Sequence, residues 1–167
     1  MHQELNDMIC DFKNSKSLQN WTVIDDGVMG GLSKGDIILG ESGNAIYSGF
    51  VSTDNNGGFS SLRYRFNLRD VSSYTSVSLR IKGDGKSYQF RIKSNTGDYY
   101  SYVSKFNSSG EWETVNIAFK DFTPQFRGRI LDMANFKGDT MEEVAFLIGN
   151  KVKESFQLEI ESISLSR

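Results

Sequence analysis

Two adjacent carboxylates, Asp25 and Asp26, begin a glycine-rich run that contains Met29 and ends at Ser33. A pair of carboxylates could carry out acid–base chemistry or bind a cation. Neighbouring residues of a strand point to opposite faces, however, so the pair shares a site only where the chain bends. The alternative is that one carboxylate caps the glycine turn while the other is solvated.

A second glycine pair, Gly57 and Gly58, leads into Ser60 and Ser61. Glycine weakens a strand interior and usually marks a positive φ, a bulge or a close backbone approach. We therefore expect both glycine-rich segments to shape a surface. At least two of four glycines should have a positive φ or lie on a bulge, namely Gly30, Gly31, Gly57 and Gly58.

Four arginines could bind an anion if the fold brings them together. Arg63 and Arg91 lie in predicted strands, whereas Arg127 and Arg129 lie in a long irregular segment, 120–137. Convergent guanidinium groups bind carboxylate or phosphate through paired hydrogen bonds. The alternative is that these side chains are solvated and pair only occasionally with Asp or Glu. We expect segments 25–33, 60–63 and 126–129 to meet on one side of the molecule.

Aromatic side chains offer a third kind of site. Tyr88, Tyr99, Tyr100, Tyr102 and Trp112 could form a flat platform for a sugar or a base. The alternative is that they belong to the core, with the Tyr hydroxyl groups at its edge.

The chain offers little for catalysis. Its one histidine, His2, lies near the N-terminus, and its one cysteine, Cys10, has no CxxC partner. The glycine runs match neither GxGxxG nor a P-loop. We therefore predict no catalytic residue, no metal site and no cofactor.

Composition indicates one folded domain spanning residues 1–167. Apolar residues make up 38% of the chain and charged residues 24%, with a net charge of −2. That balance argues against nucleic-acid binding. No stretch approaches the ~20 apolar residues of a membrane-spanning helix. Because no signal or transit peptide is visible, we expect a cytoplasmic location.

The dominant hydrophobic period is two, which predicts an antiparallel β-sandwich or barrel. Strands 76–82 and 87–93 are expected to form a hairpin through the Asp-Gly turn at 83–85. Single helical turns are expected at 14–18 and 139–143. The predicted inter-sheet core consists of apolar residues from alternating positions: Val77, Leu79, Ile81, Phe90, Ile117, Phe146, Leu158 and Ile160.

Several short motifs occur in order along nearly the whole chain, from about Trp21 to Ile163. Each is weak alone, and together they are fairly specific. They are Trp21, segment 25–33, segment 50–52, segment 57–63, segment 82–88, Trp112 with Val115, segment 122–129 and segment 156–160.

In these motifs the chain resembles the complex I intermediate-associated protein family. The resemblance implies a galactose-binding-like jelly roll, and a non-enzymatic role in protein interaction or in the assembly of a respiratory complex. A different class of function, a carbohydrate-binding module, remains the alternative for the same fold, with a saccharide in place of a protein partner. A redox-cofactor-associated enzyme is the third hypothesis.

Overall fold

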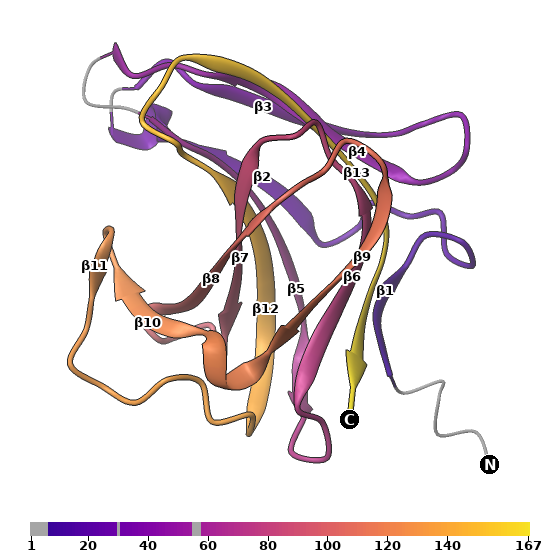
Figure 1. Ribbon diagram of the computed structural model, residues 1–167, viewed down its shortest axis with the longest axis vertical. Coiled ribbons are helices and arrows are strands. Elements are labelled where there is room, and N and C mark those ends of the chain that lie inside the picture. Colours follow the sequence, from indigo (N-terminus) through magenta and orange to yellow (C-terminus); the bar gives the residue numbers. More distant parts are fainter. Residues whose placement is uncertain (1–6, 30, 55–57) are drawn as a thin grey trace.

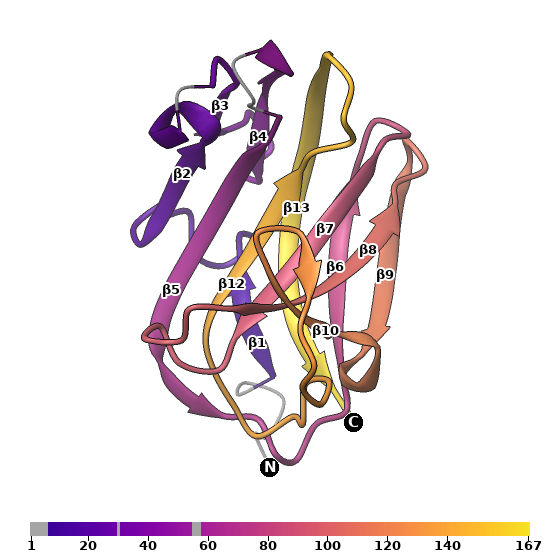
Figure 2. The ribbon, with the colours of Figure 1, turned by 90° about the vertical axis from the view of Figure 1, so that its left-hand side faces the viewer.

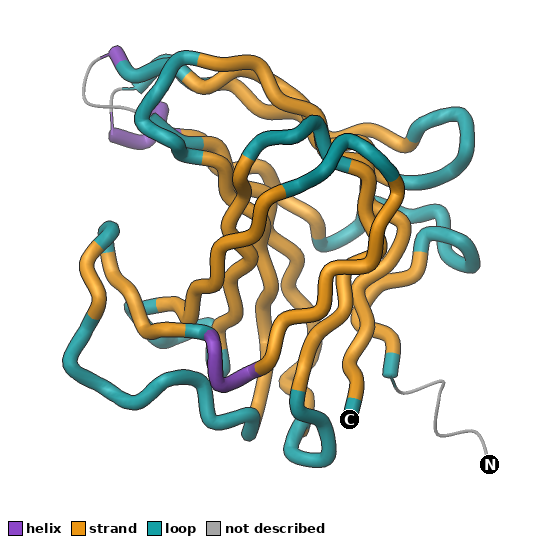
Figure 3. The backbone as a smooth tube through the Cα atoms, viewed as in Figure 1, coloured by secondary structure: helices purple, strands orange, loops and turns teal. Residues whose placement is uncertain are grey.

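The computed structural model describes residues 7–29, 31–54 and 58–167, which fold into two packed antiparallel sheets (Figures 1 and 3). Sheet A has the order β3 (Lys34–Leu39), β4 (Ala45–Val51), β13 (Glu154–Ser166), β6 (Ser76–Lys82) and β9 (Trp112–Ala118), and β1 (Met8–Asp11) also pairs with β13. Sheet B has the order β11 (Arg129–Ile130), β10 (Thr123–Phe126), β8 (Ser101–Asn107), β7 (Ser87–Lys93), β12 (Thr140–Ile148), β5 (Ser60–Asp70) and β2 (Trp21–Asp25). The architecture is the predicted all-β sandwich of the jelly-roll class.

The core lies between the two sheets, because alternate strand residues point inward. The aromatic and aliphatic residues of β7 and β12 pack there; for example, the rings of Phe90 and Phe146 meet edge to face at 5.1 Å. Every residue predicted for the inter-sheet core is buried, which confirms the predicted core. The predicted core faces of β6, β7 and β13 are therefore correct.

The turn between β6 and β7 connects the two sheets. Gly85 has a φ of +84°, as the Asp-Gly turn predicts. Yet β6 pairs with β9 and β13 of sheet A, whereas β7 pairs with β8 and β12 of sheet B. The predicted hairpin is therefore wrong. The turn residues permit a tight reversal, but they do not determine which strand becomes the next neighbour.

The segment 120–137 is more regular than predicted. After the short 3-10 turn Phe119–Asp121, β10 pairs with β8, and a tight turn at Arg127 (φ +51°) and Gly128 (φ +80°) leads into β11. Figure 2 shows this β10–β11 hairpin in front of the strands of sheet B. The expected helical turns are both wrong: 14–18 is not helical, and 139–143 leads into and forms the start of β12. In the described part of the chain, no helix is long and apolar enough to cross a membrane.

Candidate functional site

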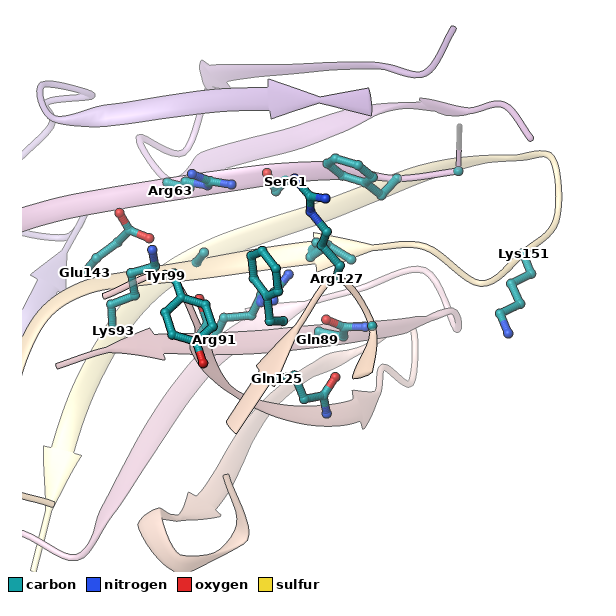
Figure 4. A pocket seen from close by; sticks show the side chains of 17 residues that line it. Ser61, Arg63, Gln89, Arg91, Lys93, Tyr99, Gln125, Arg127, Glu143 and Lys151 are labelled. Carbon is teal, nitrogen blue, oxygen red and sulfur yellow. The ribbon is translucent and has the colours of Figure 1, made fainter. Parts of the chain in front are cut away.

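The outer face of sheet B carries a groove of about 600 Å³. Its floor comes from β5, β12 and β7, and the β10–β11 hairpin forms one wall (Figure 4). Gly58 and Phe59 lie near the end where β5 begins, together with Lys151 from the turn after β12. The volume is in the range of ligand-binding clefts.

Strand alternation determines which side chains reach this groove. In β5, Leu62 is fully buried in the core, so Arg63 points to the opposite face. In β7, Phe90 and Ile92 are fully buried, so Arg91 between them points into the groove. The two arginines predicted from the sequence therefore line the same cleft, although 28 positions along the chain separate them.

The groove is strongly cationic, whereas the whole chain has a net charge of −2. One carboxylate, that of Glu143, lines it, and this side chain forms an ion pair with Arg65 at 2.8 Å. Against this single carboxylate stand five cationic side chains: Arg63, Arg91, Lys93, Arg127 and Lys151. This face of an acidic protein therefore attracts anions.

Arg91 is held in an unfavourable environment. Its Nε is buried and has no hydrogen-bond partner in the described part of the chain. Burial lowers the pKa of the Arg91 guanidinium, and the positive charge of Arg63 lowers it further against the opposing effect of Glu143. The pKa of Lys93 is also lowered by burial. A bound anion would relieve this crowding of like charges.

The β10–β11 hairpin places a cation and one aromatic ring at the rim, and Tyr99, from the segment before β8, adds a second ring. The Arg127 guanidinium lies over the Phe126 ring, 5.1 Å from its centroid. In Figure 4 the Arg127 side chain extends toward Ser61 of β5. Tyr99 is 63% exposed, and its ring meets that of Phe126 edge to face at 5.1 Å. This wall can cover the apolar part of a ligand.

The carboxylates of the first glycine run have structural partners outside the groove. Asp25 accepts hydrogen bonds from the Ser60 hydroxyl (2.5 Å) and the Gly35 backbone N–H (3.0 Å). Asp26 is 1% exposed and binds both the backbone N–H and the hydroxyl group of Ser33. Neither carboxylate forms an ion pair with an arginine of the described chain. Segment 25–33 therefore contacts the start of β5 but does not line the groove, so the groove itself brings together two of the three expected segments, 60–63 and 126–129.

Two glycines allow the backbone to approach the buried Asp26 carboxylate closely. Gly58, at φ +143°, donates its N–H to Asp26 Oδ2 at 2.6 Å. Gly31 lacks a positive φ, but a Cβ there would collide with the Asp26 carboxylate. Gly30 and Gly57 lie outside the described residues, and Met29 lies in the 3-10 turn Asp26–Met29.

Two further candidates lie away from the groove. Tyr88 is 1% exposed, stacks on Phe106 in the core and donates its hydroxyl to Asp84. Arg129 is exposed on β11 and does not line the groove. Ser61 does line it, but its hydroxyl already donates to the Ile24 carbonyl at 2.7 Å.

The predicted aromatic platform does not form as a unit. Tyr100 and Tyr102 line a separate cavity of about 300 Å³, and Trp112 packs under Arg80 of sheet A. Only Tyr99 of that set lines the groove. No group of three or more His, Cys, Asp or Glu side chains in the described ranges could hold a metal ion.

Several residues of the groove were not predicted from the sequence. For the residues of β7 and β12, alternation with core residues was the available signal, but it could not show that these strands are neighbours. The overlooked residues that matter most are Gln89, Lys93, Gln125, Glu143 and Ala145.

Known proteins resemble most of this chain. The family model described as Complex I intermediate-associated protein 30 matches residues 10–160. The mitochondrial protein of that name from Mus musculus is 25% identical over 95% of this chain, and the one from Drosophila melanogaster is 26% identical over 75%. The chain spans about half the length of these relatives, covering 55% and 50% of them.

Among solved structures, the Family 11 carbohydrate-binding module from Clostridium thermocellum, in complex with a mixed-linked tetrasaccharide, superposes with a TM-score of 0.69. Identity is 22%, and the match covers 96% of this chain and 94% of that one. An exo-beta-agarase matches with a TM-score of 0.58 at 10% identity, over 95% of this chain and 25% of its own. At these identities the likeness shows the fold alone.

The relatives correct the expected cellular location. Those from mouse, fly and Caenorhabditis briggsae are all named as mitochondrial proteins. The expectation of a cytoplasmic location conflicts with those names and is wrong. It rested on the absence of a visible targeting sequence, which is a weak argument for any chain.

Proposed function

The chain belongs to the complex I intermediate-associated protein 30 family, and on this premise we propose that it is a non-enzymatic binding module that docks a protein partner during the assembly of a larger complex. The proposed docking surface is the groove on sheet B. Relatives that carry the family name are described as associated with complex I intermediates. We propose the same class of partner for this chain.

The observation that carries the proposal is the set of unpaired cations in the groove. Arg65 has an ion-pair partner in Glu143, but Arg63 and Arg91 have none in the described ranges. A sandwich fold does not need a desolvated arginine on the outer face of its sheet. Unpaired charges that lower the stability of the free domain are typical of surfaces that acquire their partner groups on binding.

A saccharide in the same groove is the second candidate, and one observation favours it. The exposed ring of Tyr99, supported by Phe126, offers an apolar face of the kind on which sugars stack. The cationic floor argues for a charged ligand, since a neutral glucan would leave the guanidinium groups uncompensated. We therefore place the saccharide second.

The proposal can be tested by affinity capture from the organism's own cells. We would compare the tagged chain with the double variant Arg63→Gln/Arg91→Gln and with a matched control, Arg80→Gln, on the outer face of sheet A. We expect the wild type and the control to retain complex I subunits, identified by mass spectrometry, and the groove variant to lose them. Equal capture by all three proteins, or no capture of these subunits by any, would contradict the proposal.

The alternative is tested separately by calorimetry with the mixed-linked tetrasaccharide. Tight binding of this neutral ligand, unchanged in the Arg63→Gln/Arg91→Gln variant, would favour the saccharide over the protein partner. We expect no measurable heat of binding. Melting temperatures of all variants, measured alongside, would show that each protein is folded.

A further inference from the structure

The floor of the groove is built from three rows of residues that run across the strands. Pairing of β5 with β12, and of β12 with β7, sets which residues stand opposite one another. Each row has one residue from each of these strands. The rows are Ser61–Leu147–Gln89, Arg63–Ala145–Arg91 and Arg65–Glu143–Lys93.

The three rows differ in how charge is balanced. In the third row, Glu143 stands between two cations and contacts Arg65 at 2.8 Å. In the middle row the corresponding position is Ala145, whose methyl group compensates no charge. The middle row therefore has two arginines with the geometry of an ion-pair triad, but it lacks the central anion.

The spacing suits an anion between the two arginines. Adjacent strands lie about 4.8 Å apart, so the Cα atoms of Arg63 and Arg91 are separated by about 10 Å. Long side chains on either side of a small residue can converge above it. Arg91 Nε is already buried at this place and lacks an acceptor among the described residues. An acceptor above Ala145 would satisfy it.

We propose that the row Arg63–Ala145–Arg91, here called the arginine row, binds a carboxylate supplied by an acidic side chain in an extended segment of the protein partner. The partner as the source of the carboxylate rests on the function proposed above. The carboxylate site itself rests only on the geometry of the arginine row. The planar carboxylate fits the paired donors of a guanidinium group.

The rest of the groove suits an extended polypeptide. Gln89 and Gln125 line it with amide groups that can donate to and accept from a peptide backbone. Leu147 and the ring of Phe126 provide apolar contacts for neighbouring side chains. The overall negative charge of the chain repels an acidic segment elsewhere, so the cationic groove would also set where that segment docks.

The binding test uses two synthetic peptides of equal length, pentaglutamate and pentaglutamine, titrated into the full chain by calorimetry. We expect the wild type to bind pentaglutamate, and to bind pentaglutamine at least about tenfold more weakly, because only pentaglutamate offers the guanidinium groups a charged acceptor. Arg91→Gln should weaken pentaglutamate binding by about tenfold or more. The matched control, Arg80→Gln, should bind like the wild type.

Ala145 allows a sharper comparison. Ala145→Asp places a carboxylate between the arginines, whereas Ala145→Asn adds a side chain of the same size without the charge. We expect the Asp variant to melt at a higher temperature than the Asn variant, and to lose pentaglutamate binding by about tenfold relative to it. If the Asp variant does not fold, pentaglutamate binding by Arg91→Gln, compared with Arg80→Gln, still tests whether the arginine row binds a carboxylate.

Several results would overturn the inference. Equal binding of the two peptides, or equal weakening by Arg80→Gln and Arg91→Gln, would show that no specific carboxylate site exists. Tight binding of an oligogalacturonate, or of inorganic phosphate, without binding of pentaglutamate would overturn the peptide as the source of the anion. Pentaglutamate binding in a chain that captures no complex I subunit would leave the carboxylate site standing and refute the function proposed above.

Discussion

Replacement of Asp26 should reveal what the first glycine run does. The Asp26 carboxylate is buried and accepts four hydrogen bonds from two other segments of the chain. The donors are the N–H (2.9 Å) and the hydroxyl (2.5 Å) of Ser33, the N–H of Gly58 (2.6 Å) and the N–H of Phe59 (3.2 Å). The carboxylate thus joins the end of β2 to the segment before β3 and to the start of β5.

The loss of stability expected for Asp26→Ala follows from these contacts. A hydrogen bond to a charged group contributes about 1.5–3 kcal/mol, but four bonds to one carboxylate are not additive. Asp26→Ala leaves these donors without their acceptor, and each buried donor that stays unsatisfied costs about 1–3 kcal/mol. We therefore expect Asp26→Ala to lower the free energy of unfolding by about 3–5 kcal/mol in urea denaturation at neutral pH. Asp36→Ala, at an exposed position of β3, is the control and should change it by less than about 0.5 kcal/mol.

The pH dependence of stability gives a second reading of the same contact. Burial raises the pKa of Asp26, but the bonds from Ser33, Gly58 and Phe59 outweigh it, so the pKa is lowered from its ordinary 3.8. A carboxylate with a lowered pKa stabilises the fold above its ordinary pKa, and this contribution is lost as the pH falls through the lowered value. The stability difference between the wild type and Asp26→Asn should therefore shrink below pH 3.8. A loss of under 1 kcal/mol for Asp26→Ala, or a difference that does not vary with pH, would refute the structural role.

Two further predictions concern packing. Leu79→Ala, at a fully buried position of β6, should lower the free energy of unfolding by about 2–5 kcal/mol in urea denaturation, and a loss below about 1 kcal/mol would contradict the assigned core face. Gly31→Ala should lower the free energy of unfolding by about 1–3 kcal/mol, because the new Cβ collides with the Asp26 carboxylate. The control Gly27→Ala, with open space at its Cβ, should be as stable as the wild type. Equal effects of the two variants in thermal melts would contradict close packing of Gly31 against Asp26.

The fold could be predicted from local patterns because strand alternation is a local property. It placed Phe90 in the core, and the same alternation in β5 puts Leu62 inside and Arg63 on the outer face in the structure. The topology could not be obtained in this way. The Asp-Gly turn before β7 permits both a hairpin and a crossing between sheets, and only the packing of distant strands decides between them.

The candidate site shows the same limit. Arg63 and Arg91 were identified by residue type, but the position of Ala145 between them depends on the register of three strands far apart in the sequence. Asp26 carried the same chemical signal as a binding residue, because a carboxylate that clamps backbone N–H groups has the same residue type as one that binds a ligand. Burial distinguishes the two roles, and the sequence does not report burial at a glycine turn.

The arginine row can be observed most directly through the Nε–H signals of arginine side chains in a nitrogen–proton NMR titration with pentaglutamate. We predict that the signals of Arg63 and Arg91 shift together and saturate at one dissociation constant, while the signal of Arg80 stays in place. The signals would be assigned from the single arginine-to-glutamine variants. Binding of the peptide with unchanged Arg63 and Arg91 signals, or with equal shifts at Arg80, would contradict a carboxylate site in the groove.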